Sequence, residues 1–215
     1  MNGYFITGTD TNVGKTYVST SLARRAVTRG HKVFAFKPIE TGCARDANGQ
    51  YVGADQELLA AAAGNWQQGE LRGLYRFQLP AAPLVAASAE AASIDLDFIA
   101  RMTKEAVLQH AATLTLVEGA GGWRVPITSA GDMSSLARLL GLPVILVARA
   151  ALGTINHTLL SIEAILRDEL SIAAVVLSRR PEDDLAESNH EQIARRWPGR
   201  ILMLEADASQ LDSLL

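Results

Sequence analysis

The segment from Gly8 to Thr16, which reads GTDTNVGKT, limits the possible folds of this chain more than any other segment. It follows a short apolar run and precedes residues with helical spacing. A glycine-containing turn between a strand and a helix directs several backbone N–H groups at one point, where they bind phosphate. Lys15 adds an ammonium for the terminal phosphates, and the Thr16 hydroxyl is a ligand for Mg²⁺. The strict pattern has its first glycine at Thr9, one residue later than here, but the context predicts a nucleoside triphosphate site.

Short apolar runs alternate with helical segments along the chain. The expected strands are Tyr4–Thr7, Val33–Lys37, Leu114–Glu118, Val144–Ala148, Ala174–Ser178 and Ile201–Leu204. The expected helices are Lys15–Arg29, Ala54–Ala63, Leu96–His110, Ile155–Asp168 and Leu185–Trp197. Most of these strands are continuously apolar, which is typical of parallel strands covered on both faces. We therefore predict a three-layer, doubly wound α/β fold with a mostly parallel sheet, whose ligands bind beyond the carboxyl ends of the strands.

Composition is that of an ordinary globular protein. The 215 residues, 48% of them hydrophobic, predict one domain over residues 1–215. Residues 64–83 are rich in glycine and proline but keep apolar side chains, so we expect them to cross the top of the sheet. The net charge of -3 predicts neither a nucleic-acid nor a membrane partner. With Cys43 as the single cysteine and no secretory signal pattern at the start, we expect a cytoplasmic protein.

Polar side chains follow several of the predicted strands. Lys37 ends one strand, Glu118 ends another and is expected to emerge beside the following glycine-rich loop, and Asp55 lies near the start of a helix. Together with Thr16, the two carboxylates have the oxygen ligands that a hard cation prefers. Taken singly, Asp55 is equally explained as a favourable charge at a helix N-terminus, and Lys37 as a surface lysine. The position of Glu118 favours a role in ligand binding.

Five blocks then occur in a specific order. They are residues 8–16, Lys37-Pro38 with Thr41-Gly42, Ala54-Asp55, residues 118–122 (EGAGG) and residues 152–157 (LGTINH). In this order the chain resembles the dethiobiotin synthetase family over nearly its whole length. The resemblance implies a P-loop NTPase-like fold and an ATP- and Mg²⁺-dependent ligase. In that reaction 7,8-diaminopelargonic acid captures CO₂ as a carbamate, the γ-phosphate is transferred to it, and the second amine closes the ureido ring, the penultimate step of biotin synthesis.

The resemblance also implies a role for each matching residue. Lys37, Lys15 and Thr11 are the expected catalytic residues, and Thr16, Asp55 and Glu118 the expected metal ligands. The expected nucleotide-binding residues are Asn12, Val13, Gly14, Lys15, Thr16, Tyr17, Asp55, Glu118, Gly119, Ala120, Gly121 and Ser178. The expected substrate-binding residues are Thr11, Lys37, Thr41, Gly153, Thr154, Ile155 and Asn156. In the family the last four serve the neighbouring subunit's site, which implies a homodimer. The alternative is a simple helix cap, in which Asn156 or Thr154 binds its own backbone, and both roles can hold at once.

Some positions depart from the family pattern. Ser178 stands where many relatives have an asparagine that reads the nucleobase, and a hydroxyl does not reproduce the donor and acceptor of an amide. Asn12 stands where some members carry glutamate. We therefore expect ATP and leave CTP or GTP open. Two alternatives remain: a ParA/MinD-like switch ATPase, which usually has a further lysine early in the loop, and a catalytically weakened nucleotide-binding paralogue.

Overall fold

The computed structural model describes residues 1–180 and 183–215. In these residues six parallel strands form one sheet, in the order β10-β9-β8-β1-β7-β2. Their bounds are β1 Gly3–Gly8, β2 Val33–Phe36, β7 Leu114–Gly122, β8 Val144–Arg149, β9 Ile172–Ser178 and β10 Ile201–Leu204. The chain starts in the middle of the sheet, extends to one edge and then returns past β1 to build the other half. The predicted doubly wound α/β fold is confirmed, and the strand order reverses next to β1, where ligands bind in such sheets.

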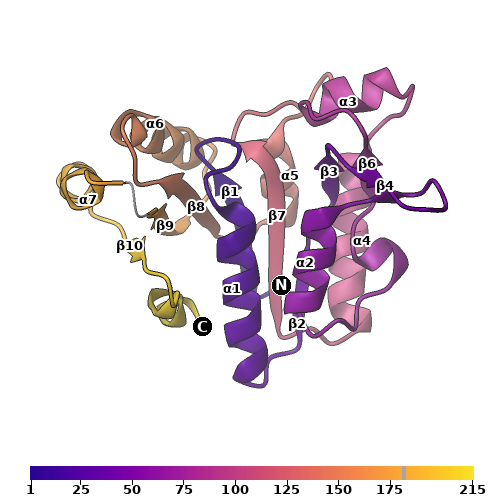
Figure 1. Cartoon of the computed structure of the whole chain (residues 1–215), viewed down its shortest axis with the longest axis horizontal. Coiled ribbons are helices and arrows are strands. Elements are labelled where there is room, and N and C mark those ends of the chain that lie inside the picture. Colours follow the sequence, from indigo (N-terminus) through magenta and orange to yellow (C-terminus); the bar gives the residue numbers. More distant parts are fainter. Residues whose placement is uncertain (181–182) are drawn as a thin grey trace.

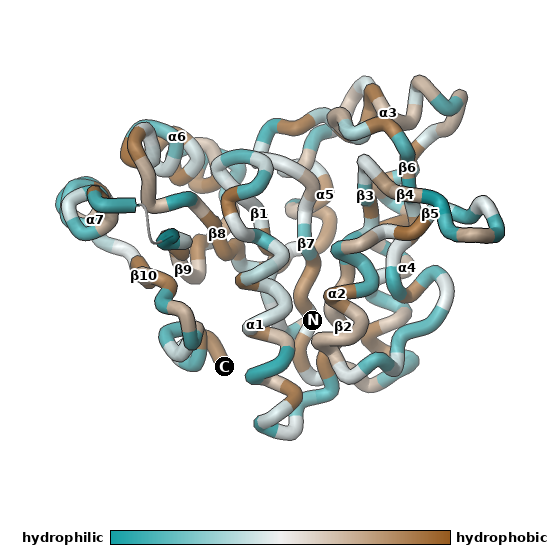
Figure 2. The backbone as a smooth tube through the Cα atoms, in the orientation of Figure 1, coloured by the Kyte–Doolittle hydropathy of each residue, from teal (hydrophilic) through white to brown (hydrophobic). Residues whose placement is uncertain are grey.

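Helices cover both faces of the sheet (Figure 1). One face carries α1 Lys15–Thr28, α2 Ala54–Ala62 and the 3₁₀ helix η2 Ser209–Leu214, and the other carries α4 Leu96–Gln109, α5 Met133–Leu140, α6 Thr154–Arg167 and α7 Ala186–Ala194. The side chains of consecutive strand residues point to opposite faces of the sheet, so that Phe5 packs into one buried cluster and Ile6 into the other. Most residues of the central strands are accordingly apolar (Figure 2), because both of their faces are removed from water.

Several smaller elements were not predicted. They are α3 Pro83–Ala89, α5, the 3₁₀ turn η1 Gly69–Leu71, the parallel pair β3 Ile39–Thr41 and β6 Tyr75–Phe77, and the hairpin β4 Ala44–Arg45 and β5 Tyr51–Val52. Asp132 caps the start of α5, where its carboxylate accepts a hydrogen bond from Ser135 N in a capping box, and Gly141 with φ +66° caps the end. These start and stop signals were present in the sequence.

Residues 64–83 take a different course from the one predicted. The first part of this region runs along the open edge of β2 instead of over the top of the sheet. The Gln67 amide accepts a hydrogen bond from Ala35 N at 3.2 Å and donates one to Ala35 O at 2.9 Å, and the Trp66 indole donates to Val33 O at 2.8 Å. These side chains satisfy edge groups that a further strand would otherwise bind. Only β6 and the residues after it lie toward the strand ends that carry the site (Figure 1).

None of the helices in the described residues is long and apolar enough to cross a membrane.

Candidate nucleotide and metal site

The phosphate loop joins β1 to α1 in the predicted way. Gly14 has φ +103°, a conformation that favours glycine, and Lys15 directly after it is the first residue of α1. A Cβ added at Gly8 would lie 2.7 Å from Val13 Cγ2 and 3.1 Å from Lys15 Nζ, so the loop closes tightly over position 8. This explains why the glycine lies there, one residue before its place in the strict pattern.

The Lys15 ammonium lies inside this loop. Its Nζ donates a hydrogen bond to Asp10 O at 2.8 Å. Burial is the largest influence on the Lys15 pKa and lowers it to about 8, with the nearby Lys37 ammonium acting in the same direction against the attraction of Glu118. A phosphate that enters the loop would raise the pKa of Lys15 again, because its negative charge stabilises the protonated form of the buried ammonium.

Glu118 is buried below the loop, with 1% of its surface exposed. Its Oε1 accepts a hydrogen bond from Thr16 Oγ1 at 2.9 Å, and its Oε2 accepts one from Ser19 Oγ at 2.7 Å. The prediction that Glu118 ends a strand and emerges at the sheet edge was wrong, because β7 continues to Gly122 and Glu118 pairs in register with Ile6. Ser19 was missed, although its spacing of three residues from Thr16 on α1 places both hydroxyls on one face.

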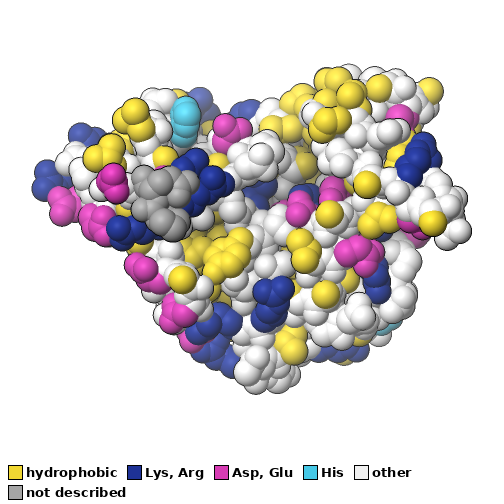
Figure 3. Space-filling view, viewed as in Figure 1, with side chains coloured by type: hydrophobic (Ala, Val, Ile, Leu, Met, Phe, Trp, Pro, Cys, Tyr) yellow, Lys and Arg dark blue, Asp and Glu magenta, His cyan; other side chains and the backbone are white. Residues whose placement is uncertain are grey.

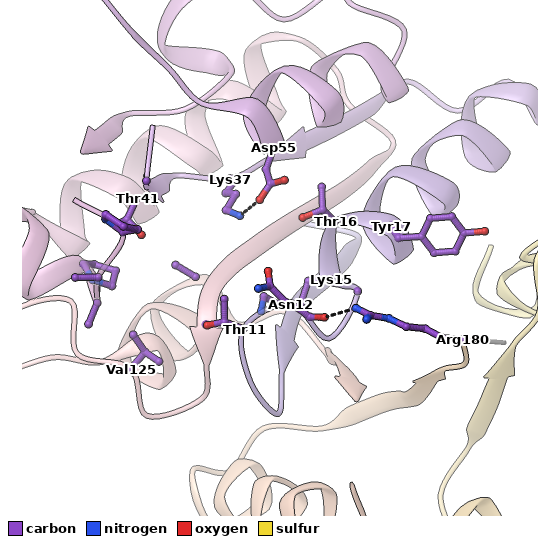
Figure 4. Close-up of a pocket in the computed structure, with 18 residues that line it drawn as sticks. Thr11, Asn12, Lys15, Thr16, Tyr17, Lys37, Thr41, Asp55, Val125 and Arg180 are labelled. Carbon is purple, nitrogen blue, oxygen red and sulfur yellow. Dashed lines mark hydrogen bonds and ion pairs between the residues drawn. The ribbon is translucent and has the colours of Figure 1, made fainter. Parts of the chain in front are cut away.

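Lys37 follows the last residue of β2 and turns into the protein. Its Nζ forms an ion pair with the Asp55 carboxylate (Figure 4). A second ion pair joins it to Glu118 Oε1 at 3.1 Å. Burial alone would lower the pKa of Lys37, but the two carboxylates outweigh it and raise the pKa above its ordinary value. Only 7% of the residue is exposed. The alternative of an ordinary surface lysine is therefore wrong, and Lys37 is a buried cation held by two anions.

Asp55 lies in the first turn of α2, as predicted, and a second carboxylate fixes that turn. Glu40, on β3, accepts a hydrogen bond from Asp55 N at Oε1 and one from Gln56 N at Oε2, both at 3.0 Å. Burial raises the pKa of the Glu40 carboxyl, and the two N–H donors act against that effect. Sequence reasoning missed Glu40, since its partners are fifteen and sixteen residues away along the chain.

Glu40→Gln tests this cap. An amide offers one oxygen in place of two, so one N–H of the first turn loses its partner, and we expect the free energy of unfolding to fall by about 1–2 kcal/mol. The start of α2 then holds Asp55 less firmly. Urea denaturation of the wild type and the variant measures the change. Unchanged stability would mean that water replaces the lost acceptor without cost.

Thr16 and Glu118 have two oxygen atoms close enough to bind one cation in place of the hydrogen bond that now joins them. Thr16 Oγ1 and Glu118 Oε1 are 2.9 Å apart, and Mg²⁺–oxygen distances of about 2.0–2.1 Å place adjacent octahedral ligands about 3 Å from each other. The described residues hold no cluster of three or more His, Cys, Asp or Glu side chains suited to a metal ion. A cation here would therefore depend on the Thr16 hydroxyl, water and phosphate oxygens to complete its shell, which is the usual state of Mg²⁺ at a nucleotide.

A cleft of about 900 Å³ opens above these residues. It is visible in the upper middle of Figure 3, where basic and acidic side chains meet. The predicted site residues that line it are Thr11, Asn12, Gly14, Lys15, Thr16, Tyr17, Lys37, Thr41, Asp55, Ala120 and Gly121. Val13 is buried beneath the loop, and Glu118 and Gly119 lie below the floor, where Gly119 packs against Met133 and Phe5. The predictions missed Gly42, Pro80, Ala81, Ala82, Pro83, Val125 and Arg180 as lining residues.

A second, smaller cavity of about 330 Å³ adjoins the phosphate loop, and we call it the side pocket. Its lining includes Tyr17 and Ser178. Ser178 ends β9 and approaches the loop so closely that a Cβ at Gly14 would lie 2.8 Å from its Oγ. On the opposite side the Tyr17 hydroxyl donates a hydrogen bond to Ala206 O at 2.9 Å. The side pocket therefore borders the phosphate-loop residues that are predicted to bind nucleotide.

The four residues from Gly153 to Asn156 are not among those that line the cleft. Gly153 has φ +93° and precedes α6, and no side chain of the described residues caps this helix. Thr154 is buried, with its Oγ1 3.3 Å from Thr158 Oγ1. Within one chain, this predicted substrate-binding segment and the cleft are separate.

A family model described as an AAA domain matches residues 2–204. Among curated proteins, the chain is 41% identical over 215 residues to an ATP-dependent dethiobiotin synthetase BioD of Anaeromyxobacter dehalogenans (strain 2CP-C), covering 98% of this chain and 93% of the relative. It is 39% identical to the protein of the same name from Pseudomonas paraeruginosa (strain DSM 24068 / PA7), covering 94% of this chain and 88% of the relative.

Solved structures with a similar fold have much lower identity. The MinC:MinD cell division protein complex of Aquifex aeolicus matches with a TM-score of 0.58 at 12% identity, covering 94% of this chain and 79% of the other. Chloroplast FtsY of Physcomitrella patens matches with a TM-score of 0.56 at 15% identity, covering 100% of this chain and 65% of the other. At such identities the likeness concerns the fold alone.

Proposed function

The chain belongs to the dethiobiotin synthetase family, and on that premise we propose that it is an ATP-dependent dethiobiotin synthetase acting as one domain. The reaction joins 7,8-diaminopelargonic acid and CO₂ at the expense of ATP, and we place it in the cytoplasm. The observation that carries the proposal is the Lys37 ammonium, buried between Asp55 and Glu118 next to the phosphate loop. In this arrangement the Lys37 ammonium lies beside the place where two anions, a carbamate and a triphosphate, must approach each other.

Charge neutralisation is the main task of such a site, since a carbamate and a γ-phosphate repel each other in a confined cleft. We assign the terminal phosphates to Lys15, whose lowered pKa reflects a buried cation without enough negative charge around it. We assign the carbamate and the transferring phosphoryl group to Lys37, and the positioning of the diamine to Thr11 and Thr41, which line the cleft. Positioning and electrostatics then carry most of the catalysis.

Thr16, Asp55 and Glu118 are the proposed ligands of Mg²⁺. When bound, the ion neutralises phosphate oxygens and orients the triphosphate for displacement. In the structure Lys37 forms ion pairs with both of these carboxylates. Asp55 and Glu118 would hold the ion together with Thr16, and Lys37, which pairs with the same two carboxylates, lies beside that site, where it can face the substrate.

A homodimer is the second part of the proposal. The residues from Gly153 to Asn156 lie outside the cleft of their own chain, while the start of α6 leaves backbone N–H groups without a side-chain cap, an arrangement suited to a carboxylate. Two leucines near this segment are strongly exposed, Leu152 at 89% and Leu160 at 55%. We propose that these apolar side chains are covered in a dimer, in which each segment receives the substrate tail of the other subunit. Sedimentation of the purified chain tests its oligomeric state.

ATP is the proposed nucleotide, with the base in the side pocket. Ser178 has a single hydroxyl oxygen there, which donates and accepts at one atom and does not span the separate donor and acceptor on one edge of a base as an amide does. We therefore propose weak discrimination between ATP, CTP and GTP.

One assay tests the function and its main alternative. The purified chain is incubated with diaminopelargonic acid, bicarbonate, Mg²⁺ and each triphosphate, and phosphate and ureido product are measured. We expect phosphate release that depends on the diamine and equals ureido product in amount, with similar kcat/KM for the three triphosphates. Nucleotide hydrolysis that does not depend on the diamine but is stimulated by DNA or lipid vesicles would instead support a switch ATPase. Binding of nucleotide without either activity would support a weakened paralogue.

A further inference from the structure

We propose that Ser19 is a positioning residue of the metal site, where its hydroxyl holds the Glu118 carboxylate so that one carboxylate oxygen faces the proposed Mg²⁺. The inference deepens the proposed function and rests on its metal site, but not on the identity of the second substrate. Ser19 lies outside the five sequence blocks that carry the family resemblance and was not among the predicted site residues.

The two oxygens of the Glu118 carboxylate have different surroundings. Oε1 accepts a hydrogen bond from Thr16 Oγ1 at 2.9 Å and lies 3.1 Å from Lys37 Nζ. Oε2 accepts a hydrogen bond from Ser19 Oγ at 2.7 Å. Oε1 is therefore the oxygen beside the other groups of the proposed metal site, and Ser19 binds the second oxygen.

The Ser19 hydroxyl has one proton and two acceptors within reach. Lys15 O, one helical turn earlier on α1, lies 2.9 Å from Ser19 Oγ, and Glu118 Oε2 lies closer, at 2.7 Å. A hydrogen bond to an ionised carboxylate is shorter and stronger than one to a neutral carbonyl. The proton therefore goes mainly to Glu118, and the hydroxyl serves the carboxylate more than it serves the helix.

Burial makes this donor difficult to replace. Ser19 is 0% and Glu118 1% exposed, so bulk water does not readily supply another donor to Oε2. Ser19 is not among the residues that line the cleft, and it therefore acts through Glu118 and not by contact with a ligand there. A buried carboxylate oxygen without a donor is costly. Without the hydroxyl, the carboxylate would turn so that both of its oxygens share the remaining donors.

The contact between Ser19 and Glu118 can also persist when a cation binds. An ion between Thr16 Oγ1 and Glu118 Oε1 replaces the hydrogen bond that joins those two atoms, whereas the Ser19 bond is on the other oxygen. Pairing with Ile6 fixes the backbone of Glu118, but several rotatable bonds separate that backbone from the carboxylate. Ser19 fixes the far end of the side chain. Partners of this kind orient metal ligands and increase the affinity for the ion.

Ser19→Ala and Ser19→Thr test the proposal by titration with Mn²⁺ in the presence of a non-hydrolysable ATP analogue. We expect Ser19→Ala to weaken Mn²⁺ binding by about tenfold, because the ligand loses the partner that orients it. Its affinity for the analogue in EDTA should stay within about twofold, since the phosphate loop is unchanged. Ser19→Thr keeps the hydroxyl, and we expect it to retain most of the Mn²⁺ affinity.

Ser134→Ala is the matched control. Ser134 is also 0% exposed, and its Oγ donates to a carboxylate, Asp132 Oδ1 at 2.6 Å, at the start of α5 on the opposite face of the sheet. The substitution removes the same group from the same kind of contact away from the metal site. We expect its Mn²⁺ affinity to stay within about twofold of the wild type.

A double-mutant cycle with Glu118→Gln separates positioning from a general structural role. If Ser19 acts through the carboxylate, Ser19→Ala should change Mn²⁺ affinity by less than about twofold once Glu118→Gln is present. An equal loss in both backgrounds would mean that the substitution damages α1 or the phosphate loop, and would overturn the proposal.

The remaining outcomes are equally decisive. Unchanged Mn²⁺ affinity in Ser19→Ala would overturn the proposal, as would equal losses in Ser19→Ala and Ser19→Thr at an unchanged melting temperature. If Ser19→Ala does not fold, Ser19→Cys replaces it, because a thiol is a weaker donor; it should bind Mn²⁺ less tightly than Ser19→Thr, and equal affinity would contradict us. A wild type that binds Mn²⁺ but forms no ureido product would refute the function and leave this test intact, whereas one that binds no Mn²⁺ would refute the metal site and this proposal together.

Discussion

Replacing Lys37 with alanine is expected to lower kcat for ureido ring formation by about 10³-fold while nucleotide affinity changes by less than about threefold. The reason is the position of its ammonium, which lies between Asp55 and Glu118 and not in the loop that holds the phosphates. Lys15 and the backbone of the phosphate loop still bind the triphosphate in the variant. The missing cation affects the step in which the carbamate and the γ-phosphate approach each other.

Three measurements check this expectation. Product formation gives kcat, titration with a non-hydrolysable ATP analogue gives affinity, and titration with Mn²⁺ follows the metal site. Without Lys37 the two carboxylates lose their competing cation, so the Mn²⁺ affinity should rise. Lys104→Ala, a change of the same kind on the far face of the sheet, where Lys104 donates to Leu139 O, serves as the control. Full turnover by Lys37→Ala would remove Lys37 from the mechanism.

Glu118→Gln is expected to have the second large effect. The substitution keeps the size of the side chain but removes the charge that Lys37 and the proposed ion share. We expect kcat to fall by at least about 10²-fold and Mn²⁺ affinity by at least about tenfold, since an amide oxygen is a much weaker ligand for a hard cation than a carboxylate. The free energy of unfolding should fall by about 3 kcal/mol, because the buried Lys37 ammonium keeps only Asp55 as its partner.

Glu57→Gln is the matched control for Glu118→Gln. Glu57 lies two residues after Asp55 on α2 and pairs with Arg72, with 43% of its side chain exposed. An exposed pair contributes little to stability, so we expect no measurable change in Mn²⁺ affinity and less than about 1 kcal/mol in the free energy of unfolding. If the two variants lost metal affinity equally, the loss would come from the net charge of the protein and not from coordination by Glu118.

The errors of the sequence-based predictions have a common cause. Glu118 was placed at a strand end because an apolar run stops there, but the glycines after it continue β7 by backbone pairing alone. Residues 64–83 were placed over the sheet, whereas Trp66 and Gln67 bind the edge of β2. In both cases backbone groups found partners in a distant segment. Apolar spacing carries no information about such partners.

Residues that act through distant contacts were missed for the same reason. Glu40 caps a helix that starts fourteen residues later, and Arg180 reaches Asn12 across 168 positions of sequence. A capping signal in sequence is normally read from the residues next to the helix, and α2 has Gly53 there. Ser19 is different, since its helical spacing from Thr16 was visible and could have been used.

The sequence by itself determined the layers and the phosphate loop. Both depend on local rules: apolar runs that alternate with helical periodicity, and a glycine turn between a strand and a helix. Only the tertiary structure decided that the Lys37 ammonium lies 3.1 Å from a carboxylate 81 positions away. Local rules fix the conformation of a segment, whereas the partner of a buried charge depends on which segments the closed sheet brings together and on the cost of leaving that charge unpaired.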